Sequence, residues 1–279
     1  MALEAHLESC RQIAKTYDYE RYCACLFAPS DQQWKLFTLL AAVHEIAKTA
    51  EVVSDPMIGL IRLQWWQEAL DGIEAGTPRE HEVVQPLNAL HLEGHSLEPL
   101  RGVISAREAD LEPDSFPDTD AFKSYCRETS GTLFAMISGI LRGDEAKAVH
   151  VGTAWAMLGS IRAGRYLLSR GRNPFPSDLL AEEGTSAQQL RQSMDEAVLT
   201  RIARHVASLV RGELAAADGS HIGGRAANLP VFLLKSDLKK LLHKLEKNGI
   251  PEIENVDSGG SFVLRLAFRA GLAKIGIGL

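Results

Sequence analysis

The sequence predicts a single all-α domain. Apolar residues recur at spacings of three and four along most of the chain, as in amphipathic helices, and the alternation typical of strands is nearly absent. No long linker rich in proline, glycine or serine interrupts residues 2–249, so one domain covering residues 1–279 is expected. By this pattern the domain contains about eight to ten helices.

Composition narrows the functional classes. With 46% hydrophobic and 24% charged residues the chain can bury a sizeable core, and a formal net charge of −6 argues against nucleic acid as a main partner. The chain lacks a run of about eighteen apolar residues, and its first residues, MALEAHLESC, resemble neither a signal peptide nor a transit sequence. We therefore expect a cytoplasmic protein whose membrane contact, if any, is peripheral to the inner membrane.

The cysteines indicate neither a metal site nor a disulfide framework. None of them has the Cys-x-x-Cys spacing of a zinc site, and so few in so long a chain do not form a disulfide scaffold. We expect reduced and mostly buried thiols. The four are Cys10, Cys23, Cys25 and Cys126.

The stretch 34–76 is expected to form a helical hairpin around which the rest of the chain is organised. Its first arm is amphipathic and is expected to be capped by Ser30 or Asp31. Asp55 is expected to cap the second arm, which ends near Gly76. The second arm carries Arg62, Gln64, Trp65 and Trp66.

The remaining helices follow from the same periodicity and from their caps. Ser186 with Gln189 fits a capping box, and the acidic, proline-containing segment 112–120 predicts a solvated loop. Stretches 229–245 and 261–279 combine apolar and basic residues, and each either packs on the core or contacts a membrane or an acidic partner. Small residues along 121–143 predict close packing against a neighbour: Ser130, Gly131, Ser138 and Gly139. The predicted helical stretches are 2–19, 18–28, 83–111 with an interruption at Gly94, 121–143, 146–170, 187–217 and 228–247.

Four stretches carry a resemblance to a known family. In chain order they read YCACLFAP, IRLQWWQEALDGI, YCRETSGTLFAMISGILRG and GRNPFPSDLL. Over roughly residues 22–180 their order and spacing resemble the squalene/phytoene synthases, helical enzymes that join two prenyl diphosphates head to head. The resemblance implies the all-helical isoprenoid synthase fold, with a central apolar cavity between its helices.

The synthases need two clusters of carboxylates on helices that face the cavity. Acids four residues apart share one helical face and hold the Mg²⁺ that neutralises the diphosphate leaving group. Aligned by the resemblance, the first motif falls on residues 47–51, where Ala47 and Lys48 stand in place of paired acids. Glu51 is the one acid that remains in this motif.

The second acidic motif has lost every acid. It aligns with residues 162–167, where Arg162 is kept but Ala163 and Leu167 occupy the metal-binding pair, with Tyr166 between them. No Asp or Glu occurs between residues 149 and 176, so a shift of register by one turn does not restore the motif. We therefore expect the usual metal-dependent ionisation of prenyl diphosphates to be lost.

The pattern of loss is similar to one branch of the family. That branch includes the mitochondrial complex I assembly factor related to phytoene synthase, which also reads Arg-Ala where the enzymes read Arg-Asp. The stretches SDP and IRLQWW strengthen the resemblance. It implies a non-catalytic protein with a role in respiratory complex I assembly, a prenyl or lipid ligand in the cavity, and a complex I subunit as partner.

Nine residues are candidate ligand contacts: Tyr22, Glu45, Arg62, Gln64, Trp65, Tyr125, Arg127, Arg162 and Arg165. Ordinary structural roles compete for several of them. Trp65 and Trp66 point about 100° apart on a helix, so at least one is expected in the core. Glu45 and Lys48 have the spacing of a surface ion pair, and Tyr125 fits a buried tyrosine with a bonded hydroxyl equally well. A basic group either stabilises a helix C-terminus or forms a phosphate or anionic-lipid site: Arg162, Arg165, Arg170 and Arg172.

Two alternatives remain. The first is an active prenyltransferase of the squalene or phytoene synthase type, in which Arg162, Arg165 and Lys48 replace the charge of Mg²⁺. Guanidinium groups supply less concentrated charge than divalent ions, so a large loss of rate is expected. The second is an interaction scaffold with a filled core and no ligand. No cofactor is expected, and Mg²⁺ only if the first alternative holds.

Overall fold

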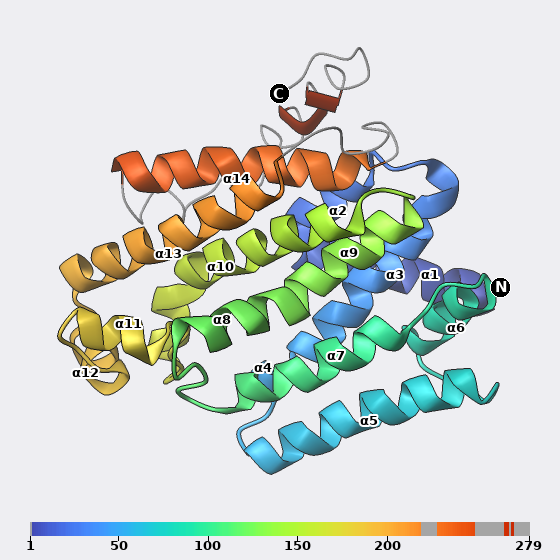
Figure 1. Ribbon diagram of the computed structural model, residues 1–279. Coiled ribbons are helices and arrows are strands. Elements are labelled where there is room, and N and C mark those ends of the chain that lie inside the picture. Colours follow the sequence, from blue (N-terminus) through green and yellow to red (C-terminus); the bar gives the residue numbers. More distant parts are fainter. Residues whose placement is uncertain (1, 219–227, 249–264, 268, 271–279) are drawn as a thin grey trace.

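The computed structural model describes residues 2–218, 228–248, 265–267 and 269–270, and every regular element within them is helical (Figure 1). The all-α prediction is therefore confirmed for the described part of the chain. The elements are α1 (Ala2–Tyr17), α2 (Tyr19–Cys25), α3 (Ser30–Ala47), α4 (Thr49–Val52), α5 (Pro56–Glu74), α6 (Val84–Leu92), α7 (Glu98–Ala106), the 3₁₀ turn η1 (Arg107–Leu111), α8 (Thr119–Cys126), the π-helical turn η2 (Arg127–Gly131), α9 (Thr132–Ile140), α10 (Glu145–Ser169), α11 (Ser177–Glu182), α12 (Ala187–Ser193), α13 (Glu196–Ala216) and α14 (Leu229–Asn248).

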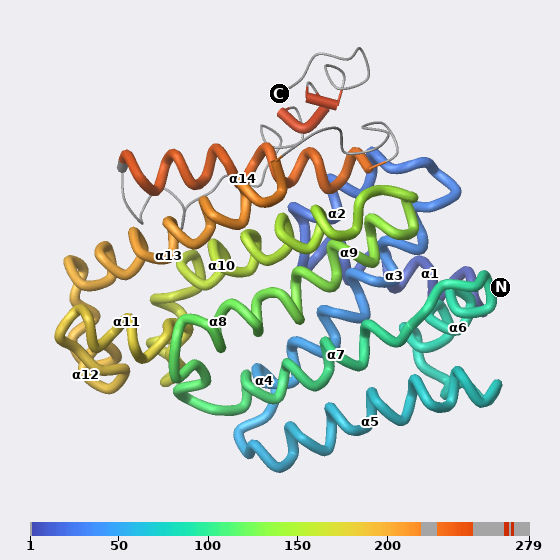
Figure 2. The backbone as a smooth tube through the Cα atoms, in the orientation of Figure 1, coloured from blue at the N-terminus to red at the C-terminus, as the bar shows by residue number. Residues whose placement is uncertain are grey.

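Helix α10 is the centre of the bundle. It packs against α8, η2, α9, α13 and α14, and Figure 2 shows it running through the middle of the molecule. Helix α9 contacts both α10 and α3, and α3 packs in addition against α1 and α6. Burying each large apolar side chain between these helices contributes roughly 1.5–3 kcal/mol. The largest fully buried side chains include Leu36, Leu39, Leu40, Phe122 and Phe134.

Helix α10 approaches η2 closely because both carry glycine at the contact. A Cβ atom on Gly152 would lie 2.3 Å from the carbonyl oxygen of Ser130 and 2.8 Å from the Cα of Gly131. The neighbouring atoms belong to the backbone, which cannot rotate away as a flexible side chain can. The close packing expected from small residues in 121–143 is therefore present at Gly131.

The hairpin expected from residues 34–76 does not form as a packed pair. Helix α5 packs against α4, α6, α7 and η1, and α7 lies between it and α3 (Figure 2). After α3 the chain continues through α4 before it turns, which carries α5 to the outer layer. The apolar face of α5 is buried there, with Leu63, Trp66 and Leu70 against the helices named above.

The caps of the two arms differ in outcome. Helix α3 begins at Ser30 with no side-chain cap, so the cap expected from Ser30 or Asp31 is wrong. The second arm begins as predicted, since Asp55 Oδ1 accepts a hydrogen bond of 2.9 Å from the backbone N–H of Met57. Gly76 follows the end of α5 with φ 73°, a left-handed conformation that favours glycine.

The helix predicted over 187–217 is two helices. Met194 has φ 46° and ends α12, and the carboxylate of Asp195 accepts hydrogen bonds from the N–H groups of Ala197 and Val198 at 2.9 and 3.1 Å. An aspartate N-cap stabilises a new helix start by about 1 kcal/mol, and here it favours a break over continuation. The cap at the start of α12 is as predicted, because Ser186 Oγ accepts from the N–H of Gln189 at 3.3 Å.

Most of the segment 112–120 is exposed, as its acids and prolines predicted, but Phe116 in its middle is buried. Phe116 is only 6% exposed. The N–H of Asn173 donates to the carbonyl of Pro113 at 2.8 Å, and the N–H of Ser177 donates to the carbonyl of Phe116 at 2.9 Å. These bonds hold residues 107–118 against the bundle. We call residues 107–118 the covering segment.

Within the described residues, no helix is long and apolar enough to cross a membrane. Of the two stretches expected either to pack or to contact a membrane, 229–245 forms α14 and packs against α13 and α10, with Leu233, Leu238 and Leu241 buried. The other stretch, 261–279, lies mostly outside the described residues. All four cysteines are buried free thiols, as expected.

We predict that Gly152→Ala destabilises the protein by about 1–3 kcal/mol, because overpacking against the η2 backbone outweighs the helical preference for alanine. The matched control is Gly212→Ala in α13, where a Cβ has open space and alanine gains about 0.5–1 kcal/mol. Urea denaturation of both variants measures the difference. Equal stabilisation by the two substitutions would contradict the close approach of α10 and η2.

Candidate functional site

A cavity of about 240 Å³ lies between α10, α8, η2 and the covering segment, and we call it the central cavity. Its α10 wall is one helical face, with Ala156, Gly159, Ala163 and Leu167 at spacings of three and four. Three of these four residues are small. Larger side chains at the same positions would fill the space, so the local sequence of α10 keeps the cavity open.

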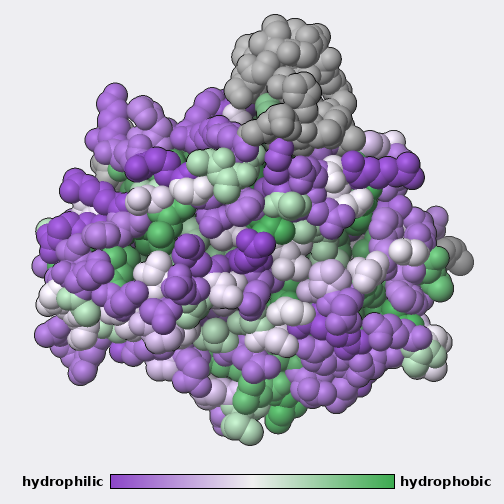
Figure 3. Space-filling view, viewed as in Figure 1, coloured by the Kyte–Doolittle hydropathy of each residue, from purple (hydrophilic) through white to green (hydrophobic). Residues whose placement is uncertain are grey.

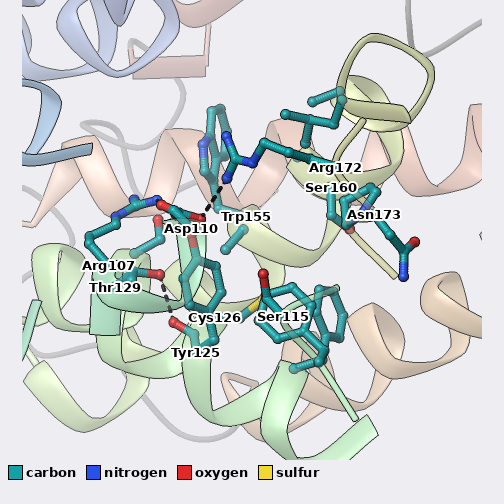
Figure 4. A pocket seen from close by; sticks show the side chains of 18 of the residues that line it. Arg107, Asp110, Ser115, Tyr125, Cys126, Thr129, Trp155, Ser160, Arg172 and Asn173 are labelled. Atoms are coloured by element: carbon teal, nitrogen blue, oxygen red, sulfur yellow. Dashed lines mark hydrogen bonds and ion pairs between the residues drawn. The ribbon is translucent and has the colours of Figure 1, made fainter. Parts of the chain in front are cut away.

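The cavity wall contains a charged cluster centred on Asp110, which we call the Asp110 cluster (Figure 4). Asp110 Oδ2 accepts from Arg107 Nη1 at 2.9 Å, and Oδ1 accepts from Arg172 Nη2 at 3.1 Å. The hydroxyl of Tyr125 donates to Asp110 Oδ1 at 2.7 Å and accepts from Arg107 Nη1 at 2.6 Å. In Figure 4 the two arginines approach Asp110 from opposite sides, so two guanidinium groups share one carboxylate.

Two ionisable groups of the cavity wall are held neutral. Burial raises the pKa of the Tyr125 hydroxyl well above its usual range, and burial likewise raises the pKa of the Cys126 thiol. The phenol therefore remains a hydrogen-bond donor to Asp110. The thiol is neutral as well, so neither group supplies an anionic nucleophile near neutral pH.

A second, more open hollow of about 570 Å³ lies beside the first, and we call it the outer cavity. Its lining comes from α4 and the start of α5, from the covering segment, and from the C-terminal end of α10. Asp110, Leu167 and Arg172 line both cavities. The ion pair between Asp110 and Arg172 is therefore part of the wall between them.

An apolar patch begins next to the outer cavity. Pro56 lines the outer cavity and begins α5, and the side chains around the first turns of α5 are exposed. Figure 3 shows apolar side chains gathered at the lower edge of this face, over α5. The patch consists of Val52, Met57, Ile58 and Ile61, which are 51–66% exposed.

The positions of the degenerate acidic motifs fall at the two cavities. Ala163 and Leu167, in place of the second motif's metal-binding pair, line the central cavity. Glu51 and the exposed Tyr166 line the outer cavity, which Leu167 also reaches. The structure thus brings together residues from both motifs, although only Glu51 among them carries a carboxylate.

Among the ligand candidates, Tyr125 lines the central cavity. The two arginines of α10 point elsewhere: Arg162 donates to both carboxylate oxygens of Glu20 at 2.7 and 3.2 Å, and Arg165 pairs with Glu196. Their positive charges are matched by these acids. Neither arginine lines either of the two cavities.

The candidates on α2 and near the end of α3 have structural contacts. Tyr22 is 4% exposed and packs its ring against Phe37, with centroids 5.0 Å apart. Glu45 accepts from Lys48 Nζ at 2.5 Å, which is the ion pair considered above, although both side chains are partly buried. Ala47, at the end of α3, lies outside the lining of both cavities.

The candidates on α5 lie in the outer layer. Trp66 is 5% exposed, so one tryptophan of the pair is in the core as predicted. Trp65 packs edge-on against Trp66, with ring centroids 5.1 Å apart, and contacts the guanidinium of Arg79. The exposed candidates are Arg62, Gln64 and Arg127.

Sequence reasoning missed Arg107 and Asp110. Their i,i+3 spacing at the end of a predicted helix was a signal of an ion pair, but it carried no indication of a cavity. Arg172 was noticed only as part of a basic group. It meets Asp110 across 62 positions of sequence, and such a contact leaves no local pattern.

Comparison with solved structures identifies this bundle as the isoprenoid synthase fold. The structure of a dehydrosqualene synthase in complex with a ligand is similar with a TM-score of 0.80 over 98% of both chains, at 12% sequence identity. The profile of the squalene/phytoene synthase family matches residues 14–256. The chain belongs to the squalene/phytoene synthase family.

Relatives of two kinds are similar to this chain. The NADH dehydrogenase (ubiquinone) complex I, assembly factor 6, of Bos taurus is 29% identical over 245 residues, covering 85% of this chain and 73% of that protein. The 15-cis-phytoene synthase of Synechocystis is 22% identical over 214 residues, covering 70% of this chain and 63% of that protein. Because these two relatives are named for different functions, the argument about function has to come from the geometry of the site.

The site does not fit the magnesium ions that the family resemblance implies for its synthases. Ala163 and Leu167 have no ligand atoms, and the described residues contain no group of three or more His, Cys, Asp or Glu side chains placed to hold a metal ion. Asp110 faces the cavity, but two guanidinium groups and a hydroxyl already bind it. A divalent cation there would meet two positive charges.

We predict that Tyr125→Phe destabilises the protein by about 1–3 kcal/mol, because it leaves Arg107 and Asp110 each without one partly buried hydrogen bond. Thermal denaturation monitored by circular dichroism measures the loss. The control is Tyr17→Phe, since Tyr17 is 65% exposed and its substitution should change stability by no more than about 0.5 kcal/mol. Equal midpoints for both variants would show that the Tyr125 hydroxyl does not support the cluster.

Proposed function

We propose that this protein is a non-catalytic member of its family that acts in the assembly of respiratory complex I and holds a prenyl chain or another lipid in the central cavity. One observation carries the proposal: the cavity is open, yet aliphatic Ala163 and Leu167 line it where a synthase needs paired acids. Similarity to a complex I assembly factor over 85% of the chain supports the assembly role. A complex I subunit is the expected protein partner.

The chemistry of prenyl coupling supports the non-catalytic assignment. Ionising an allylic diphosphate separates charge, and divalent ions stabilise the leaving group as that charge develops. The alternative route would use cations of this chain instead. Each of those cations is already paired with an acid: Arg162 with Glu20, Arg165 with Glu196 and Lys48 with Glu45. Freeing them would leave the acids unpaired, which opposes their use as diphosphate ligands.

The exposed surface supports a role that involves contact with a protein partner or a membrane. The apolar patch at the start of α5 exposes four large apolar side chains beside the outer cavity. Clustered exposed apolar residues mark protein or membrane contacts more often than scattered ones do. A complex I subunit or a peripheral membrane contact at this patch is consistent with an assembly role.

We predict no turnover of prenyl diphosphates. Purified protein incubated with farnesyl or geranylgeranyl diphosphate and Mg²⁺ should yield no squalene or phytoene above the protein-free level, because the paired acidic ligands are absent. Chromatography with mass spectrometry detects the products, and the Synechocystis phytoene synthase under the same conditions is the positive control. Formation of either product by this protein would establish the enzymatic alternative.

We predict that filling the central cavity abolishes function without unfolding the protein. Ala163→Phe should remove co-purifying lipid, measured by mass spectrometry of extracts, and should impair complex I assembly in the host, measured on native gels. The matched control is Ala216→Phe on the exposed face of α13, which should retain both. An absence of lipid from the unaltered protein would favour the scaffold alternative, and normal complex I after deletion of the gene would contradict the assembly role.

A further inference from the structure

A side-chain ion pair forms part of the wall between the central and outer cavities. Arg172 Nη2 lies 3.1 Å from Asp110 Oδ1, and both residues line both cavities. Two backbone hydrogen bonds hold the covering segment against residues 173–177 independently of this pair. Arg172 can therefore leave Asp110 without detaching the covering segment from the bundle.

The Asp110 cluster has one more cation than anion. Asp110 keeps two strong partners without Arg172, because Arg107 and Tyr125 bind it at 2.9 and 2.7 Å. Arg107 and Asp110 then form a neutral pair, and the charge of Arg172 is available for another anion. Arg107 Nε is also buried without a hydrogen-bond acceptor among the described residues, so the cluster has unmet donor capacity.

The charges of the outer cavity limit what this anion can be. Besides Arg172, its lining contains Arg170 and two further acids, Glu51 and Glu112. A head group with several negative charges and no metal would meet these two carboxylates. With Arg170 offset by these two acids, a singly charged head group matches the charge of Arg172 with less repulsion.

Apolar surface forms the larger part of the central cavity's wall, which suits an apolar chain. Phe116, Phe122 and Trp155 line it opposite or beside the small residues of α10, and its apolar lining adjoins the Asp110 cluster. A ligand that fills both environments needs an apolar chain and an acidic end. Arg172 lines both cavities, so it lies where the apolar wall meets the charged cluster.

We infer that the two cavities together bind a single-chain amphiphile with a singly charged acidic head group, such as a long-chain carboxylate. The chain occupies the central cavity, and the head group replaces Asp110 as the ion-pair partner of Arg172. No metal takes part, and Asp110 stays bound to Arg107 and Tyr125. This inference rests on the proposed function, because it names the class of lipid that the cavity holds.

Calorimetric titration of the full-length protein in EDTA with laurate and with dodecanol tests the inference. These probes share a chain and differ in charge. The unaltered protein should bind laurate about tenfold or more tightly than dodecanol, and Arg172→Gln should remove that difference while leaving dodecanol binding within about twofold. Asp110→Asn should bind laurate more tightly, because it removes the competing carboxylate.

Two controls separate this role from general effects of charge or folding. Arg204→Gln removes an exposed arginine of α13 outside both cavities and should leave laurate binding unchanged. Raising the salt concentration should weaken laurate binding by the unaltered protein but not dodecanol binding. This test uses the unaltered protein alone, so it does not depend on the folding of a variant.

Three outcomes would overturn the inference. Equal affinity for laurate and dodecanol, or unchanged laurate affinity in Arg172→Gln, would remove the role of Arg172 and leave lipid binding by the cavity intact. Binding of farnesyl diphosphate with Mg²⁺ in place of laurate would show that a polyanion with metal is the ligand. Failure of both laurate and dodecanol to bind would also remove the lipid role proposed for the cavity.

Discussion

The charged wall of the site depends on the carboxylate of Asp110. It joins three parts of the chain: the covering segment to which it belongs, α8 through Tyr125, and the residues after α10 through Arg172. Without it, two guanidinium groups would face each other across a cavity wall. Breaking a fully buried ion pair costs about 3–5 kcal/mol, and less is expected here because the side chains of Asp110 and Arg172 remain 13% and 25% exposed.

Helix α10 combines close packing with an open cavity. Gly152 lets its first half touch the backbone of η2, and further along Gly159 and Ala163 leave space. Small side chains there forgo dispersion contacts with the opposite wall, which costs packing energy in the free protein. A chain that fills the space offsets this cost, so the same small residues that lower the packing energy of the free protein favour occupancy.

Features that depend on neighbouring residues were predictable from the sequence. Contacts between residues far apart in the sequence were not. Asp55 and Gly76 mark helix ends through bonds and backbone angles within a few residues, so their pattern suffices. The break at Met194 depended on whether Asp195 would cap a new helix, which periodicity does not decide. Phe116 was hidden by its acidic and proline neighbours, although it alone of that segment is buried. The contact between Asp110 and Arg172 depends on the tertiary fold, which no spacing of residues records.

The exchange of acids for aliphatic residues changes what the cavity wall attracts. Paired acids attract divalent cations and, through them, a polyanion whose charge grows as the bond to the leaving group breaks. An arginine at the wall instead attracts an anion directly. Because it binds a fixed charge, it stabilises the ground state as much as any later state, and uniform stabilisation lowers no barrier. The proposed role fits this change of charge: the cavity keeps space for a chain, and its wall offers a cation where the aligned synthase motifs offer acids.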